Sequence, residues 1–122
     1  MVEDAVKKYT EIVEDLRDIS GLKFFSVLKM DELTDRWTFL FGLTGVKDLD
    51  KRQKVFIKIR EIIVRYLNAE DMQDVARIGI FSTTDHLVKD LIKFPEGEKV
   101  ENIKANGNFI HEGYILIGKK ER

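Results

Sequence analysis

The longest helical pattern in the chain occupies residues 50–68 and reads DKRQKVFIKIREIIVRYLN. At about 100° per residue, its apolar side chains cover more than half of the helix circumference. A surface helix normally has a single apolar stripe, so a wider arc indicates a helix that packs between two layers or meets a partner chain. We therefore expect one side of this helix to pack on the core. We expect a second arc to remain, with Ile57 and Val64 flanking the cationic Arg60.

The segments on either side of this helix alternate between helical and extended periods. The segment 75–82 is apolar on both faces, which predicts a central position in a sheet. The dipeptide Asn106-Gly107 predicts a tight hairpin between the last two strands, because both residues tolerate a positive φ. The predicted order is α-β-β-α-β-(α)-β-β, with helices at 2–18, 50–68 and 84–92 and strands at 22–30, 36–43, 75–82, 99–105 and 108–117.

These elements predict one α+β domain over residues 1–122, since this length supports a single core. The predicted architecture is a two-layer sandwich, in which a mostly antiparallel sheet of about five strands carries the two long helices on one face. The order of elements resembles that of the roadblock/longin-like domains and of the type III secretion chaperones. That resemblance implies dimerisation and binding to other proteins. It extends to the layout alone, so no functional residue is carried over.

Composition narrows the classes of function. The net charge is −1, so no overall field attracts nucleic acid or an anionic membrane. The chain has no cysteine, which excludes disulfides and thiolate chemistry and fits a reducing cytoplasm. The acidic N-terminus is unlike a signal peptide, and no apolar run reaches the length of a membrane span. We expect a cytoplasmic protein without a membrane partner. Charged residues make up 35% of the chain and Gln occurs twice, a balance that leans thermophilic.

Few residues are arranged for catalysis or metal binding. His86 and His111 are far apart and form no paired metal-ligand motif. Three acidic clusters lack the spacing of a calcium loop. We therefore expect no metal, no cofactor and no evident catalytic group, which leans against an enzyme. The acidic clusters are Asp31/Glu32/Asp35, Asp48/Asp50 and Glu70/Asp71/Asp74.

The leading hypothesis is a small protein-interaction module that acts as a homodimer or as the partner of a larger protein. It depends on surplus apolar surface, which in soluble proteins marks contact sites. One expected surface is the second arc of the long helix, and the other is a sheet face left without a covering layer. The residues assigned to these contacts are Ile57, Arg60, Val64, Phe25, Val27 and Leu40.

A first alternative is nucleic-acid binding through a basic stripe on the same helix. A row of cations can follow a phosphate backbone. The first helix is acidic, however, so the stripe can equally serve helix–helix complementarity. The stripe consists of Lys51, Lys54, Lys58 and Arg65.

A second alternative is small-molecule or anion binding at residues 82–86, where a strand runs into a hydroxyl-rich turn that opens a helix. Free N–H groups at a helix start can hold a phosphate or carboxylate. Ser, Thr and Asp are also the ordinary N-cap residues, so capping alone can explain the pattern. The residues are Ser82, Thr83, Thr84, Asp85 and His86.

Overall fold

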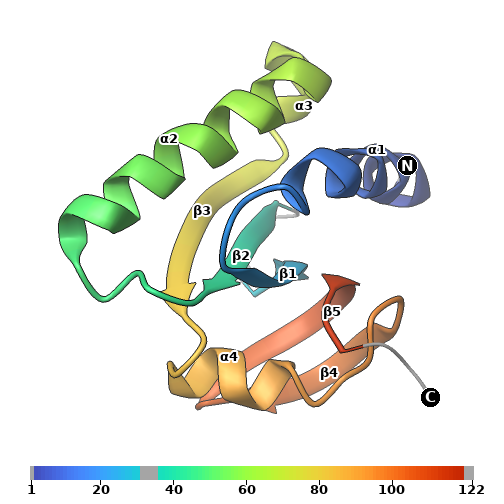
Figure 1. The fold of residues 1–122 in the computed structure, drawn as a ribbon. Coiled ribbons are helices and arrows are strands. Elements are labelled where there is room, and N and C mark those ends of the chain that lie inside the picture. Colours follow the sequence, from blue (N-terminus) through green and yellow to red (C-terminus); the bar gives the residue numbers. More distant parts are fainter. Residues whose placement is uncertain (1, 31–35, 120–122) are drawn as a thin grey trace.

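The computed structural model describes residues 2–30 and 36–119, and side chains from residue 7 onward within those ranges. The predicted order of elements is confirmed (Figure 1), with one short helix, α3, added in the acidic connection. Residues 31–35, which connect the first two predicted strands, lie outside the described residues. The elements are α1 (Val2–Leu16), β1 (Leu22–Lys29), β2 (Trp37–Leu43), α2 (Leu49–Tyr66), α3 (Ala69–Met72), β3 (Val75–Ser82), α4 (His86–Leu91), β4 (Lys99–Ala105) and β5 (Asn108–Ile117).

The five strands form one mixed sheet in the order β3-β2-β1-β5-β4. Neighbouring strands are antiparallel except β2 and β3, which run parallel because α2 forms the crossover between them. The predicted central position of β3 is wrong, because β3 is an edge strand. Its apolar residues reflect burial on two faces: Val75 and Ile80 belong to the core beneath the long helices, and Phe81 packs against the core on the other side.

The two long helices cover one face of the sheet, as predicted, and α4 lies on the other (Figure 1). α1 contributes Tyr9 and Leu16 to the larger core, and α2 contributes Ile59 and Ile63. A smaller core forms where α4 and the β4–β5 hairpin close over the opposite face. Glycine at position 42 lets α4 approach β2, since a Cβ there would lie 2.9 Å from a methyl carbon of Val88.

The predicted exposed sheet face at Phe25, Val27 and Leu40 is wrong. In the antiparallel register Phe25 lies opposite Phe41 and Val27 opposite Phe39, so these residues share the face that the long helices cover. Phe25 and Phe41 stack with ring centroids 4.4 Å apart. Leu40 is on the other face, where it is buried in the core beneath α4. None of the three is available to a partner.

Ion pairs tie α1 and Arg17, the residue that follows it, to distant segments. Lys8 Nζ lies 2.8 Å from Asp71 Oδ1 in α3, and Arg17 lies 2.9 Å from Glu96 Oε1 in the turn before β4. The hydrogen bond between Lys8 and Asp71 raises the pKa of the lysine and lowers that of the carboxyl group. These contacts link α1 to α3, and the residue after α1 to the turn before β4.

Candidate functional sites

α2 begins and ends at well-defined contacts, which fix its orientation over the sheet. Asp48 is the N-cap residue, and its carboxylate accepts a hydrogen bond from the N–H of Asp50 at 2.8 Å. Val46 and Leu67, just outside the two ends, are buried. The helix is therefore anchored at both ends, which determines which of its side chains face the core and which face solvent.

The second arc of α2 is exposed to solvent. Ile57 and Val64 keep 56% and 50% of their surface accessible, while Ile59, Ile62 and Ile63 of the same helix are buried. Arg60, one helical turn from Ile57, is exposed as well. The sequence-predicted contact residues of α2 thus lie on one open face.

A groove separates this face of α2 from strand β3. It is a hollow of about 420 Å³ with mainly apolar walls. Sequence reasoning missed the β3 side of it, because nothing in segment 75–82 shows that the strand is at an edge. We call this hollow the α2–β3 groove; it is lined by Arg52, Gln53, Phe56, Ile57, Ile78 and Ile80.

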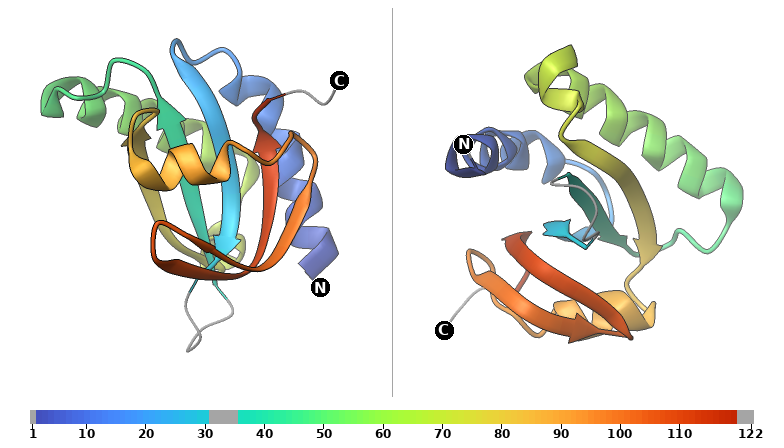
Figure 2. Two further views of the ribbon diagram at one scale, coloured as in Figure 1. Left: turned by 90° about the horizontal axis from the view of Figure 1, so that it is seen from below. Right: turned by 180° about the vertical axis from the view of Figure 1, so that it is seen from behind.

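The outer edge of β3 pairs with no other strand of the described chain (Figure 2). In a parallel ladder, alternate residues turn their N–H and C=O groups away from the partner strand, so this edge presents unpaired backbone groups. The other sheet edge, β4, is protected differently. It carries Lys99, Glu101 and Lys104, and Asn102 adopts a positive φ of 52° that interrupts the extended backbone. The edge of β3 has a single charged residue, Arg77.

Arg52 lines the α2–β3 groove, and two further cations, Arg60 and Arg77, lie on the two elements that form it. Arg60 and Arg77 are exposed and form no ion pair with the described side chains. Arg52 donates a hydrogen bond from Nε to the carbonyl oxygen of Val46 at 3.3 Å, and it forms no ion pair with a carboxylate of the described residues. On α2 as a whole, the basic residues Lys51, Arg52, Lys54, Lys58, Arg60 and Arg65 outnumber Asp50 and Glu61.

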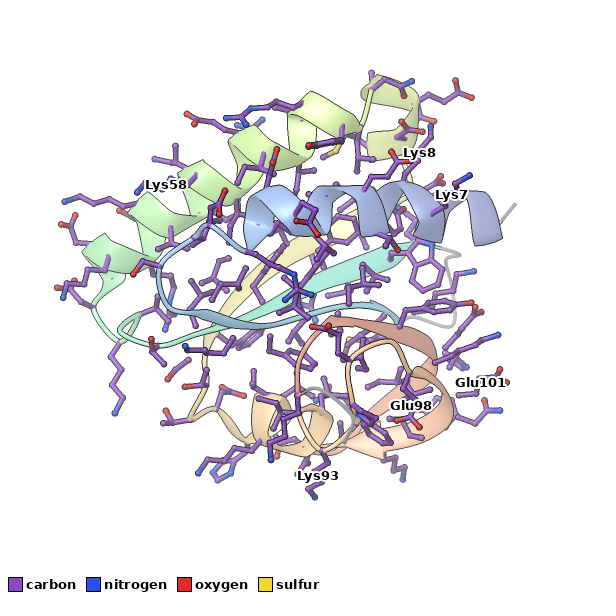
Figure 3. All side chains as sticks on the ribbon, turned by 45° about the vertical axis from the view of Figure 1, so that its right-hand side comes forward. Lys7, Lys8, Lys58, Lys93, Glu98 and Glu101 are labelled. Atoms are coloured by element: carbon purple, nitrogen blue, oxygen red, sulfur yellow. The ribbon has the colours of Figure 1, made fainter. Side chains whose placement is uncertain are left out.

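The predicted basic stripe is partly matched by carboxylates. Lys54 lies 3.6 Å from Asp50, and Arg65 lies 3.8 Å from Asp15 of α1. Asp15 also accepts a hydrogen bond from the hydroxyl group of Tyr66 at 2.8 Å, which raises the pKa of that hydroxyl. Lys58 extends outward from α2 (Figure 3). Part of the stripe therefore serves contact between α2 and α1, and nucleic-acid binding stays a prediction.

The turn at residues 82–86 divides into two parts. Asp85 is the N-cap of α4 and accepts from the N–H of Leu87 at 2.9 Å, while His86 is exposed as the first residue of that helix. Ser82 Oγ accepts from the N–H of Thr84 at 3.2 Å and lies 2.8 Å from the hydroxyl oxygen of Thr84. Helix capping thus accounts for Asp85, as the sequence analysis allowed.

The remaining residues of this turn border a second hollow of about 400 Å³. It lies where the carboxyl ends of the parallel strands β2 and β3 meet the start of α2. The structure brings Lys47 and Lys51 to the threonine-rich turn, a juxtaposition that sequence separation concealed. The lining residues are Thr44, Gly45, Lys47, Asp48, Lys51, Ser82, Thr83 and Thr84.

In the part of the chain that the structure describes, no three His, Cys, Asp or Glu side chains come together as a metal site would require. None of the described helices is long and apolar enough to cross a membrane. The acidic cluster at Asp31, Glu32 and Asp35 lies outside the described residues. Comparison of the chain with protein-family models, curated proteins and solved structures gives no significant match.

Proposed function

We propose that this chain is a small cytoplasmic protein-interaction module, acting as a homodimer or as the partner of a larger protein. The observation that supports this best is the α2–β3 groove, an apolar hollow directly beside an open strand edge. Soluble proteins usually cover or charge such edges, since exposed N–H and C=O groups invite another strand. The groove adds apolar side chains that an incoming segment can bury.

The second arc of α2 supports the same proposal. Ile57 borders the groove, and Val64 continues the exposed face along the helix. Neither side chain is needed to fill the core, because Ile59, Ile62 and Ile63 already do so from the other side. Exposed apolar side chains beside an apolar groove are typical of contact sites.

The first test is the solution mass, measured by light scattering during size-exclusion chromatography. A homodimer would have twice the 14.2 kDa of one chain. Ile57→Asp and Val64→Asp should then return it to the monomer without lowering the thermal midpoint, because both side chains are exposed in the single chain. Lys58→Asp, on the outer side of the same helix, is the matched control. A dimer indifferent to both aspartate variants would contradict contact through this surface.

A monomer would remove the homodimer and leave a larger protein as the partner. The groove would then have to accept a segment from another chain, and the peptide experiment in the next subsection tests that possibility. A monomer that also binds no such segment would contradict the proposed function as a whole.

A second candidate function is anion binding in the hollow at the start of α2. In open sheets with parallel strands, ligands bind beyond the carboxyl ends of the strands, which is where this hollow lies. Lys47 and Lys51 supply positive charge, and Thr83 and Thr84 supply hydroxyl groups.

Titration with inorganic phosphate, followed by backbone amide shifts, tests this candidate. We expect saturable shifts at residues 44–47 and 83–84, and their loss in Lys51→Ala. Lys93→Ala, an exposed lysine on the α4 side, is the control for general charge effects (Figure 3). Equal shifts with chloride at the same ionic strength would contradict a specific site.

A further inference from the structure

We propose that the occupant of the α2–β3 groove is an extended segment of another protein in which apolar and acidic residues alternate. This inference rests on the proposed function and specifies the partner. It follows from the two faces and the open edge of strand β3, which impose different requirements on a strand added beside them.

The backbone requirement comes from the edge itself. β3 is bonded to β2 on one side only, and its other side is open. An extended segment laid along it would satisfy the unpaired N–H and C=O groups in the manner of strand addition. A helical segment would not, because its backbone groups already bond to one another. The edge therefore favours an extended occupant.

The face toward α2 requires apolar side chains. Ile78 and Ile80 lie on this face of β3, and Phe56 and Ile57 form the opposite wall of the groove. The hollow of about 420 Å³ is large enough for aliphatic side chains of an added strand. Because side chains of a strand alternate between faces, every second residue of the added segment would point into this groove.

The other face requires acidic side chains. Arg77 lies one residue from Ile78 and so belongs to the opposite face of β3, where Phe81 packs against the smaller core. Arg77 is exposed and has no carboxylate partner among the described side chains. Opposite charges across neighbouring strands stabilise pairing. The residues of the added segment between its apolar positions would therefore be acidic.

A second copy of this chain fits the surface less well. Antiparallel pairing of β3 with its own copy would place both Arg77 side chains on one face of the joined sheet. It would also bring two copies of α2 together, each with basic residues in excess. Like charges brought together across an interface disfavour it. Charge complementarity thus favours an acidic segment from a different protein.

The test compares two labelled peptides of about ten residues, the upper range of ordinary strand lengths. One alternates valine with glutamate, and the other alternates valine with lysine. Fluorescence anisotropy should show saturable binding of the glutamate peptide, with the lysine peptide at least about tenfold weaker. Amide shifts of the chain should move along β3 and at residues 56–57, where the groove lies.

Variants of the chain sharpen the comparison. Arg77→Glu should reverse the order of the two affinities, because it changes the charge beside the added strand. Lys104→Glu makes the same change on the other edge strand, β4, and should leave both affinities within about twofold. Ile57→Asp should weaken both peptides, because it places a charge in the apolar wall.

The outcomes separate this inference from the proposed function. Equal binding of the two peptides would overturn the acidic preference. Absence of peptide binding in a dimer that Ile57→Asp dissociates would show that a second copy occupies the groove, so the inference fails and the proposed function stands. Absence of peptide binding in a monomer would overturn both.

Discussion

Ser26 is a buried hydroxyl in the middle of β1 with no hydrogen-bond partner among the described residues. It pairs with Leu40 and faces the smaller core beneath α4. A buried hydroxyl loses its bonds to water on folding, and an unsatisfied one costs about 1–3 kcal/mol. The Ser26 hydroxyl therefore contributes no hydrogen bond to the described structure and lowers its stability.

Replacing this hydroxyl should stabilise the protein. We expect Ser26→Ala to raise the free energy of unfolding by about 1 kcal/mol, because it removes an unpaired polar atom at the cost of a very small void. Urea unfolding followed by circular dichroism measures the change. Ser20→Ala, at an exposed position, should stay within about 0.5 kcal/mol of the wild type. Destabilisation by Ser26→Ala would show that the hydroxyl is bonded in solution.

The close approach of Gly42 to Val88 gives a second prediction at the residue scale. A methyl group at position 42 would collide with the Val88 side chain and with the Cβ of Phe24 at 3.1 Å. Gly42→Ala should therefore destabilise the protein by about 1–3 kcal/mol through overpacking. In the double variant with Val88→Ala, the loss should be smaller than the sum of the two single losses. Additive losses in this double-mutant cycle would contradict a direct clash.

The faces of β1 show what residue patterns can and cannot reveal. The alternation of Phe25 and Val27 with their neighbours correctly showed that the two share a face. It could not show which face, because a strand has the same period of two in either orientation. The pairing with Phe39 and Phe41 decides it, and that pairing is made across a hairpin rather than within the segment.

At the scale of elements, an exposed ion pair between Lys8 and Asp71 joins α1 to α3, and its effect depends on pH. The pKa of Asp71 is lowered from its ordinary value of 3.8 by the hydrogen bond from Lys8 and then by the one from the backbone of Asn68. The Lys8 pKa is raised from 10.5 by the same pair. The folded chain therefore holds the proton of Asp71 less tightly than the unfolded chain does, and that of Lys8 more tightly.

The sign of the pH dependence follows from these directions. The contribution of Asp71 is complete above pH 3.8 and disappears as the pH falls through the lower folded pKa. The contribution of Lys8 is complete below pH 10.5 and disappears as the pH rises through its higher folded pKa. Asp71→Asn should lower the thermal midpoint near neutral pH, and the difference from the wild type should shrink below pH 3.8. High salt should shrink it at neutral pH as well. A difference that persists in acid would assign the effect to the cap at Asn68 instead.

For α2 the sequence predicted the exposed apolar arc, but for β3 it did not predict the position at the edge of the sheet. The residues of the excess apolar arc of α2 lie in one continuous stretch of sequence, so the arc could be recognised from its periodicity alone. The groove beside it needed the position of β3, and a strand apolar on both faces looks the same at the centre and at this edge. Likewise, Lys47 and Lys51 line the same hollow as Thr83 because β2 and β3 are parallel neighbours, so that the segment after β2 and the segment after β3 lie at the same end of the sheet.

At the scale of the whole molecule, the sheet should open unevenly. β1 lies in its centre and is hydrogen-bonded to β2 and β5, and its side chains contribute to the cores on both faces of the sheet. Hydrogen exchange should be slowest at β1 amides, which exchange through global unfolding. Outward amides of β3 should exchange faster than amides of β1 and slow down when the glutamate peptide is added. Equal protection of β1 and β3 in the free chain would contradict an open edge.

The central place of β1 also has a consequence for biosynthesis. β1 is the first strand to be made, and β5, which completes one of its sides, is the last. While a ribosome adds about 5–20 residues per second, the nascent chain carries β1 with that side unfilled and the apolar residues of both faces incompletely covered. Such an intermediate is a natural client for a chaperone at the tunnel exit. Premature termination anywhere before β5 would yield a product prone to aggregate rather than a smaller folded domain.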